Sequence, residues 1–449
     1  MEMNLADYVK TELPKWPNWL TVPLLKLNVF GPLVYGKEYK KILTHIDDGD
    51  PEKKLCDIVN FSIANVPYYR KRYKGLSIRS IAEFEREINF IDKDEVMAHW
   101  DEFQADGANL LRSVTGTTGG TSGKPLKLVL PQNRYAHSMA FWHKELEWFG
   151  WHYDARAVIR NHHLPEKRNY MINPILREII FDAFRMTAPY AKRCLHTMKI
   201  YGVKYLHAYP SAAYQFLKLC HRQGLDTSFI RLCILTSEGV TNEQRFFIEN
   251  ELHIKIYSSY GHSEKLIMAG NCPHSSLYHI EENYGYCELV NTAGKVIKNA
   301  REAGELVGTT FINRLMPLIR YRTGDFSSYA DSSCNVHGKK YRYLNGVQGR
   351  REKSLIYKAD GTTTSLTALN LHGKVYEHID GLQYAQTKKG ELTVRIIRNE
   401  SFSAEDELFL LHFHQEAMGA EAKINIQYVD RLEYQPNGKF LPLISTLNN

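Results

Sequence analysis

Residues 118–125 read TGGTSGKP, a run of small hydroxyl residues and glycines closed by a lysine and a proline. Glycine tolerates positive φ and lets the backbone approach a ligand closely. Thr118, Thr121 and Ser122 add short hydroxyl groups, and Lys124 adds a mobile positive charge. Successive backbone N–H groups in such a loop form a concave site for anions. The segment therefore predicts a loop that binds nucleotide phosphates, and a flexible Ser/Thr/Gly linker is the competing interpretation.

Two enzyme classes with similar motifs are excluded. A Walker A loop requires GxxxxGK followed by Ser or Thr, but Thr118 stands five residues before Gly123, and Pro125 follows the lysine. A serine hydrolase of the nucleophile-elbow type requires GxSxG. Ser122 lies in GTSG and Ser237 in TSEG, so neither serine has that context.

The composition is that of a globular protein with two or three cores: 449 residues, 43% hydrophobic and 24% charged. The 57 basic and 50 acidic residues give a net charge of +7 without a long basic run, so we expect an anionic small substrate rather than nucleic acid. No apolar run approaches the roughly 20 residues of a membrane span, so no integral membrane segment is expected. Seven scattered cysteines and an N-terminus without a signal-peptide pattern favour the cytoplasm.

From residue 126 onward the pattern alternates between short apolar runs and longer amphipathic ones, which is typical of βα units. Thr241 and Gln244 have the spacing of a capping box at one helix start. Residues 284–329 are rich in β-branched, aromatic and turn residues, which predicts a β-rich subdomain. The expected strands are 126–130, 155–160, 231–235 and 255–259, and the expected helices are 134–149, 210–220 and 241–252.

The last hundred residues read as a compact α+β pattern of the usual size for a domain. The expected elements are strands 354–357, 382–386, 392–397 and 423–429 and helices 365–379 and 405–418. The fold class is therefore α/β, with a large N-terminal domain of several subdomains, one of them β-rich, and a small α+β C-terminal domain. We place the boundary between residues 1–349 and 350–449.

Two polar segments follow expected strands. YSSYGHSEK, at residues 257–265, presents Tyr260, Gly261 and Glu264 where open α/β sheets bind ligands. Glu264 could hold Mg²⁺, or it could be a solvated carboxylate at a helix start. LIRYRTGD ends in Asp325, which could accept two ribose hydroxyls or could only stabilise a turn.

Two further segments flank the C-terminal domain. NGVQGRREK, at residues 345–353, reads as a hinge with Arg350 facing a nucleotide, or as a charged linker. QPNGKF, at residues 435–440, presents Lys439 on a turn, where an exposed lysine usually has no function.

In their order, TGGTSGKP, YGHSE, RYRTGD, GRREK and PNGKF resemble the adenylate-forming superfamily, whose patterns include TSGTTGKP, YGxTE, YRTGD, GRxDD and PxGK. The resemblance covers about residues 110–440. Within the superfamily the chain is most similar to the phenylacetate-CoA ligase-like branch, which includes the CapK-type proteins of polysaccharide gene clusters. The supporting stretches are VPYYRKRY at 66–73, HAYPSAAYQFLK at 207–218, TSEGVT at 236–241 and MPLIRYRTGD at 316–325.

The resemblance implies a role for each matching residue. Mg²⁺ would be bound by Glu264, the ribose by Asp325 with Arg350 nearby, and the substrate carboxylate and α-phosphate by Lys439. The β- and γ-phosphates would be held by Thr118, Thr121, Ser122, Gly123 and Lys124, and the adenine by Ser237, Glu238, Gly239, Tyr260 and Gly261. Glu352 would be the hinge. Two positions depart from the family pattern, since Gly119 replaces a serine and Glu352 replaces the usual Asp or Lys.

The resemblance further implies an AMP-forming acid–thiol or acid–amine ligase that uses ATP and Mg²⁺. Such an enzyme forms an acyl-adenylate from a small carboxylic acid and passes the acyl group to a thiol, such as coenzyme A, or to an amine. A mobile C-terminal domain would carry Lys439, and the CapK likeness suggests capsular polysaccharide biosynthesis. The alternative is a non-catalytic member of the family that acts as a binding or scaffolding protein. The oligomeric state stays open, with a homodimer as one option.

Four residues have the types and spacings of a zinc site. Six residues separate Cys272 from His279, and Cys334 and His337 follow CxxH spacing. Four such ligands suit tetrahedral Zn²⁺, and some relatives in this branch have a comparable Cys/His pair. The competing interpretation is a set of unrelated thiols and surface imidazoles. Rival ligands in the same region are His274 and Cys287.

Overall fold

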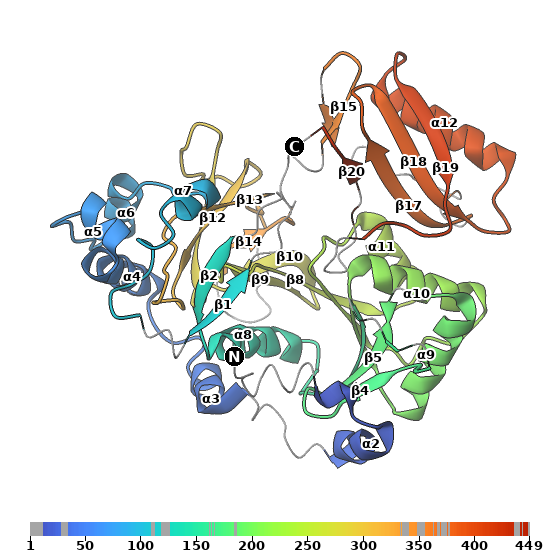
Figure 1. Cartoon of the computed structure of the whole chain (residues 1–449), viewed down its shortest axis with the longest axis horizontal. Coiled ribbons are helices and arrows are strands. Elements are labelled where there is room, and N and C mark those ends of the chain that lie inside the picture. The colour runs from blue at the N-terminus through green and yellow to red at the C-terminus, as the bar shows by residue number, and fades with distance from the viewer. Residues whose placement is uncertain are drawn as a thin grey trace. The chain divides into compact units, whose positions relative to one another are not determined.

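The computed structural model divides into two compact units, Met1–Gln348 and Gly349–Asn449 (Figure 1). Each unit is described by itself. The described residues are 12–27, 35–108, 113–117, 126–160, 162, 164–165, 167–183, 186–332, 334, 341–347, 355–361, 363–365, 369, 375, 378–434, 441 and 443–447.

The first unit is built on a nine-stranded sheet with the order β14-β10-β9-β8-β7-β6-β3-β5-β4. Its centre is parallel from β5 to β8, and antiparallel strands close both edges. The parallel strands are β3 (Arg156–Arg160), β5 (Glu178–Asp182), β6 (Tyr205–Ala208), β7 (Leu232–Thr236) and β8 (Lys255–Gly261). The edge strands are β4 (Met171–Asn173), β9 (Met268–Cys272), β10 (Ser275–Ile280) and β14 (Tyr343–Leu344).

Helices cover both faces of this sheet. Side chains alternate between the two faces along each strand, so both faces carry side chains that pack against helices. Ile159, Leu206 and Leu235 pack on one face against α9 (Ala188–Ile200) and α10 (Pro210–Arg222). Ile234 and Tyr257 pack on the other face against α8 (Arg134–Glu147). After β7, α11 (Asn242–Phe246) continues into a π-helix at Phe247–Glu251.

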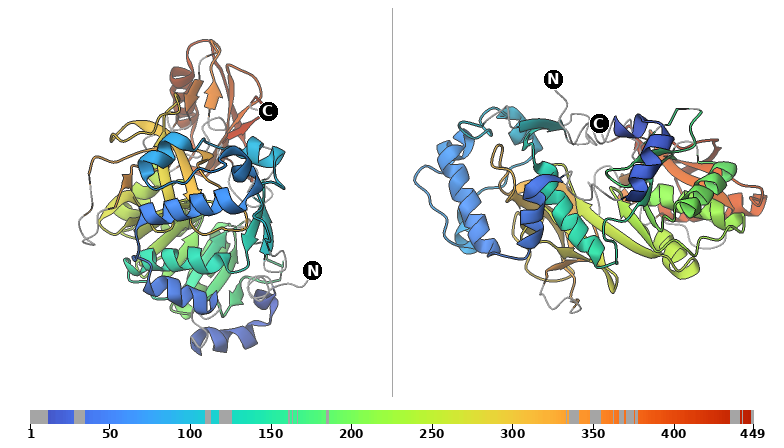
Figure 2. Two further views of the ribbon diagram at one scale, coloured as in Figure 1. Left: turned by 90° about the vertical axis from the view of Figure 1, so that its left-hand side faces the viewer. Right: turned by 90° about the horizontal axis from the view of Figure 1, so that it is seen from below.

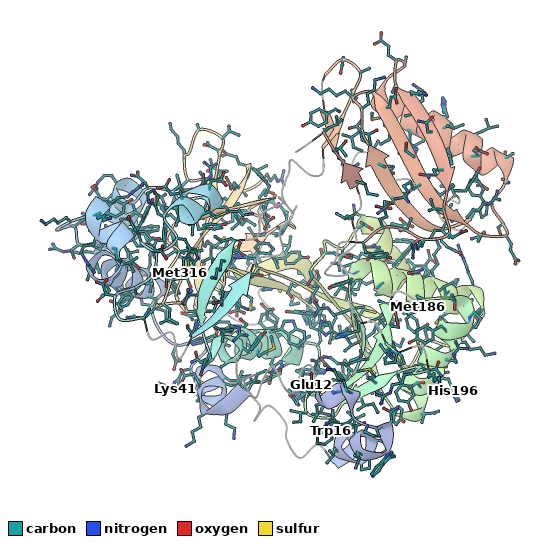
Figure 3. The ribbon with its side chains drawn as sticks, in the orientation of Figure 1. Glu12, Trp16, Lys41, Met186, His196 and Met316 are labelled. Atoms are coloured by element: carbon teal, nitrogen blue, oxygen red, sulfur yellow. The ribbon has the colours of Figure 1, made fainter. Side chains whose placement is uncertain are left out.

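A second sheet of the first unit is antiparallel and has the order β11-β12-β13. Its strands are β11 (Gly285–Val290), β12 (Ala303–Thr310) and β13 (Tyr321–Ser328). It shares a core with the hairpin of β1 (Ser113–Thr117) and β2 (Lys127–Pro131) and with N-terminal helices, which face the viewer in Figure 2, left. Met316, labelled in Figure 3, is fully buried in that core.

The N-terminal helices of the first unit range from three to 15 residues in length. They are η1 (Leu13–Lys15), α2 (Asn18–Leu27), α3 (Gly36–Thr44), α4 (Pro51–Asn65), α5 (Pro67–Arg72), α6 (Ile81–Glu87) and α7 (Lys93–Ala98). A buried ion pair ties α6 to the antiparallel sheet, since Arg320 lies 2.8 Å from Glu288 and donates to the carbonyl of Glu85 at 2.9 Å. Among the described helices, none combines the length and apolarity needed to cross a membrane.

The second unit is a four-stranded sheet, β19-β18-β17-β20, packed against one long helix. The helix, α12 (Ala404–Met418), begins with a capping box formed by Ser403 and Asp406. The strands are β17 (Ile379–Gln386), β18 (Glu391–Arg398), β19 (Lys423–Tyr428) and β20 (Leu443–Ser445), with a separate hairpin of β15 (Leu355–Tyr357) and β16 (Thr363–Ser365).

The expected α/β class and βα alternation are confirmed, as is the capping box of Thr241 and Gln244. The helix expected at residues 365–379 is wrong at both ends, because Ser365 lies in β16 and Ile379 in β17. The three threonines at 362–364 favour an extended strand over a helix. Most of the remaining residues between these two strands lie outside the described part.

Candidate functional site

The structure describes only part of the predicted site. Outside the described residues lie Thr118, Thr121, Ser122, Gly123, Lys124, His337, Arg350, Glu352 and Lys439, whose roles stay predictions. The strands that flank the phosphate loop are described, and they pair antiparallel with Thr117 opposite Lys127. The described candidates are Ser237, Glu238, Gly239, Tyr260, Gly261, Glu264, Cys272, His279, Asp325 and Cys334.

Two predicted site residues that lie 65 positions apart in the chain are in direct contact. Tyr260, at the end of β8, donates a hydrogen bond from its hydroxyl to Oδ2 of Asp325 at 2.8 Å. Burial and the neighbouring Asp325 charge raise the pKa of Tyr260 well above its ordinary value, so the phenol remains a donor. The aromatic ring and the carboxylate therefore form one fixed group.

The position of Asp325 depends on an irregular stretch of β13. Glu305 of β12 is opposite Phe326, but Val307 is opposite Arg322, so β13 holds two extra residues at this point. Gly324 takes a φ of 72°, which glycine adopts without strain. Such bulges redirect side chains beside active sites.

Glu305 stabilises this bulge, and it is not among the site residues predicted from the sequence. One carboxylate oxygen accepts from the backbone N–H of Gly324 at 3.0 Å, and the other accepts from Nε of Arg322 at 2.7 Å. Thr323 adds a hydroxyl bond to the carbonyl of Leu306 at 2.7 Å. No local pattern links Glu305 to the RTGD motif, because the two meet only across the strand pair.

The segment expected to lie along the adenine follows β7, the neighbour of β8. Thr236 is opposite Ser259 in the strand register, which brings Ser237 close to Tyr260. Ser237 has a φ of 73°, an uncommon conformation for a residue with a side chain. Such strain persists only where surrounding contacts maintain it. The end of β7 is therefore a constrained turn beside the Tyr260–Asp325 pair.

Glu238 supplies part of that constraint. Its Oε2 accepts from the backbone N–H of Ser211 at 3.2 Å and from the Ser211 hydroxyl at 2.8 Å. Ser211 lies in the first turn of α10, where unpaired backbone N–H groups favour a carboxylate. Gly239 follows, and a Cβ built there would lie 3.8 Å from the carbonyl oxygen of Val347. The predicted adenine segment therefore lies near the backbone of Val347.

Glu264 lies in a turn between β8 and β9, just after Gly261, the last residue of β8. Its side chain is 7% exposed and its Oε2 lies 3.2 Å from Nδ1 of His262. No helix starts here, so the alternative of a solvated carboxylate at a helix start is wrong. Lys265, the next residue, has a φ of 60° and donates to the Ser138 hydroxyl at 2.9 Å. A buried carboxylate at the end of a central strand suits a Mg²⁺ ligand.

Three of the four predicted zinc ligands lie together. Cys272 of β9, His279 of β10 and Cys334 present ligand atoms that all lie within 4.8 Å of one another, and the two sulfurs are 3.6 Å apart. Nδ1 of His279 lies 3.2 Å from the carbonyl oxygens of Gly270 and Leu277. A ring N–H that donates to a carbonyl orients the other nitrogen as a ligand. Two thiols and one imidazole in this arrangement fit zinc.

The comparisons with known proteins agree with this fold. Residues 356–446 match the family model of the CapK C-terminal domain. A phenylacetate-coenzyme A ligase of Pseudomonas putida is 30% identical over 148 residues, which are 30% of this chain and 31% of that relative. The sequence match therefore spans about a third of the relative's length.

Solved structures match over most of the chain. A 2-hydroxyisobutyryl-CoA ligase in the postadenylation state in complex with 2-HIB-AMP superposes with a TM-score of 0.67 at 15% identity, covering 88% of each chain. The same ligase in the thioesterification state with 2-HIB-AMP and CoA gives a TM-score of 0.55 at 18% identity, covering 90% of this chain and 89% of that one. The resemblance to the adenylate-forming superfamily is thus confirmed: the chain has the fold of its CoA ligases, and its C-terminal segment matches the CapK C-terminal domain family.

Proposed function

We propose that this protein is an AMP-forming ligase that activates a small carboxylic acid with MgATP and transfers the acyl group to a thiol, such as coenzyme A, or to an amine. The observation that carries the proposal is the Tyr260–Asp325 hydrogen bond beside the turn after β7. These are the positions at which the family resemblance expects adenine and ribose. A non-catalytic binding or scaffolding protein is the alternative, but it would have no need of a fixed aromatic–carboxylate pair at that place.

The chain's charged residues match the demands of this reaction. A carboxylate and an ATP α-phosphate repel each other, so adenylation requires positive charge where the two groups meet. Lys124 and Lys439 would supply part of it. Mg²⁺, held by Glu264, would supply the rest when bound. Asp325 and Arg350 would hold the ribose, with Ser237, Glu238, Gly239 and Gly261 around the base.

ATP–pyrophosphate exchange against a panel of aryl, acyl and amino acids tests the first half-reaction. We expect exchange that depends on one class of acid and is absent without acid. Mass analysis of the products with coenzyme A or amines in the reaction would then identify the acceptor. Silence across the panel, in a protein that still binds ATP, would favour the non-catalytic alternative.

A role in capsular polysaccharide biosynthesis extends the proposal, supported by the match of residues 356–446 to the CapK C-terminal domain. We also propose the cytoplasm as its location. The structure describes all seven cysteines and joins none of them in a disulfide, which fits a reducing compartment. Amines on sugars or amino acids are the acceptors that this setting would offer, and a homodimer stays an option.

We further propose that Cys272, His279 and Cys334 hold a structural Zn²⁺ ion, with His337 as fourth ligand. Elemental analysis of purified protein should find about one zinc per chain, and Cys272→Ser should lose it. Cys56→Ser, which removes a thiol elsewhere in the first unit, should keep the metal. Protein that is folded without stoichiometric zinc would contradict the proposal.

A further inference from the structure

A cationic side chain lies at the same edge of the central sheet as the proposed nucleotide site. Arg160 is the last residue of β3, and His207 lies near the end of β6. Strands β3, β6 and β7 are parallel neighbours, so their carboxyl ends lie side by side. Ligands of open α/β sheets bind outside these carboxyl ends.

The side-chain contacts of Arg160 are with uncharged groups. Its Nη2 donates to the Ser237 hydroxyl at 3.2 Å, its Nη1 lies 3.4 Å from Nε2 of His207, and its guanidinium lies 5.1 Å from the centre of the Tyr209 ring. Asp182, the register partner of Arg160 on β5, accepts instead from the backbone N–H of Leu164 at 3.0 Å. Among the described residues, no carboxylate forms an ion pair with Arg160.

Other arginines of the first unit behave differently. Arg156, at the opposite end of the same strand, lies 2.6 Å from Glu178, and Arg320 lies 2.8 Å from Glu288. Both pairs are structural, since a partly or fully buried guanidinium is normally matched by a carboxylate. Arg160 differs from these two arginines in having no carboxylate partner among the described residues, and it lies at the ligand edge.

Two buried donors beside this charge lack acceptors within the described part of the chain. Nε of Arg160 is buried without a hydrogen-bond partner, and so is Nδ1 of His207. Burial and the Arg160 charge hold the pKa of His207 well below its usual range, so its ring is neutral. Nε2 of His207 also lies 3.2 Å from the Thr236 hydroxyl, which can donate or accept. Because the guanidinium of Arg160 can only donate, a neutral ring that accepts from it through Nε2 carries its proton on Nδ1. Both orphan nitrogens are then N–H donors, which an oxyanion would satisfy.

The Ser237 turn keeps this arrangement rigid. Its strained φ of 73° places the hydroxyl on Arg160, and the neighbouring Glu238 is anchored to Ser211 of α10. The cation is therefore fixed next to the segment proposed to hold adenine. It lies three strands from the Tyr260–Asp325 pair, which is about 14 Å at the usual strand spacing.

We propose that Arg160, together with His207, binds a second anionic group on the acid that the enzyme activates, so that the substrate class is a carboxylic acid bearing a further carboxylate or phosphoryl group. This inference rests on the proposed ligase function. The reacting carboxylate is a poor candidate for this place, because an arginine ion pair would stabilise the nucleophile in its ground state. An oxyanion remote from the reacting carbon gains charge-assisted hydrogen bonds without that cost.

Matched pairs of acids test the assignment. Each pair shares one carbon skeleton and differs in a second carboxylate or a methyl group in its place. We expect kcat/KM in ATP–pyrophosphate exchange to favour the diacid at least tenfold in the wild type. Arg160→Leu should abolish that preference, Arg160→Lys should keep part of it, and Arg193→Leu, on the surface of α9, should leave it unchanged. The KM for ATP should stay the same in all variants.

Three results would overturn the proposal: preference of the wild type for the monoacid, an equal loss for both members of a pair in Arg160→Leu, or a raised KM for ATP, which would make Arg160 a nucleotide contact. If no acid supports exchange, the ligase function fails, and calorimetric titration with the same diacids decides the anion site alone. Diacid binding that Arg160→Leu loses and Arg160→Lys retains would support the site. Absence of anion binding in folded wild type would refute it.

Discussion

The carboxylate of Asp325 is oriented by a protein donor. A carboxylate offers about four acceptor positions, and the Tyr260 hydroxyl uses one of them on Oδ2. The ribose hydroxyls would therefore meet a carboxylate whose orientation is already fixed. Such preorganisation lowers the entropy cost of binding.

We expect Asp325→Ala to raise the KM for ATP in the exchange assay by 10- to 100-fold. The physical reason is the loss of hydrogen bonds to a charged group, which contribute about 1.5–3 kcal/mol each. Tyr260→Phe should have a smaller effect, since the carboxylate remains. Asp331→Ala, an exposed position six residues further on, should behave as wild type. An unchanged KM in Asp325→Ala would exclude Asp325 from the nucleotide site.

His143 makes the stability of the first unit sensitive to acid. The ring is buried against Trp142 and Trp151, and its Nδ1 lies 2.7 Å from the Tyr39 hydroxyl. Desolvation by burial, with a contribution from Arg156, lowers the pKa of His143 from 6.5 to about 3. Between these pH values the unfolded chain binds a proton that the folded chain does not, so stability falls as the pH falls.

From pH 7 to pH 5, this one group should reduce the free energy of unfolding by about 2 kcal/mol. Urea unfolding of His143→Phe should show a correspondingly smaller difference between the two pH values, whatever its absolute stability. His152→Phe, at an exposed position, provides the control. Parallel pH dependence in wild type and His143→Phe would show that His143 titrates normally in the folded protein.

At the scale of single elements, the bulge in β13 sets the orientation of Asp325, and the hydrogen bonds of Glu305 stabilise this bulge. We expect Glu305→Leu to lower the free energy of unfolding by about 1–3 kcal/mol, because the Gly324 N–H loses its acceptor. It should also raise the KM for ATP, since Asp325 is no longer held in place. Glu305→Gln should keep the free energy of unfolding and the KM for ATP closer to those of the wild type. The free energy of unfolding of Glu302→Leu, at an exposed position, should stay within about 0.5 kcal/mol of wild type. A changed stability with an unchanged KM would separate the bulge from the nucleotide site.

The sequence predicted elements well where one physical signal dominated. Strands β3 and β7 have four of their five residues buried, and the first half of β8 is buried from Ile256 to Ser258. Helix α8 spans Arg134–Glu147, close to the expected range 134–149. The helix expected over 365–379 was wrong at its start, because Thr363–Ser365 pairs with Leu355–Tyr357 in a hairpin. The residues of a strand do not indicate which distant segment of the chain it pairs with.

The same distinction separates the predictable part of the site from the rest. Tyr260, Asp325 and Glu264 lie in motifs with a recognisable order, and the spacing of Cys272, His279 and Cys334 was sufficient to suggest their cluster. Glu305, Ser211 and Arg160 act on residues of other strands or helices through tertiary contacts. Only the folded chain brings each of them to its partner.

At the scale of the whole molecule, the division into Met1–Gln348 and Gly349–Asn449 separates most of the residues proposed to bind the nucleotide from Lys439. The described residues proposed to bind base, ribose and Mg²⁺ all belong to the first unit, whereas Arg350, also proposed for the ribose, belongs to the second. Lys439, expected to bring charge to the reacting carboxylate and α-phosphate, belongs to the second. The family resemblance implies a mobile C-terminal domain, whose rotation would withdraw Lys439 after adenylation. The two half-reactions should therefore differ in their need for it.

We expect Lys439→Ala to lower the rate of ATP–pyrophosphate exchange by at least 100-fold, because removing one preorganised cation from a developing negative charge typically costs about 2.7–4 kcal/mol. Transfer of the acyl group from a supplied acyl-adenylate to the acceptor should keep most of its rate, since that step takes place after the lysine has withdrawn. Lys423→Ala, at an exposed position of β19 in the same unit, should leave both rates unchanged. Equal loss of both half-reactions in Lys439→Ala would mean that one arrangement of the two units performs both steps. A normal rate of ATP–pyrophosphate exchange in this variant would exclude Lys439 from the mechanism.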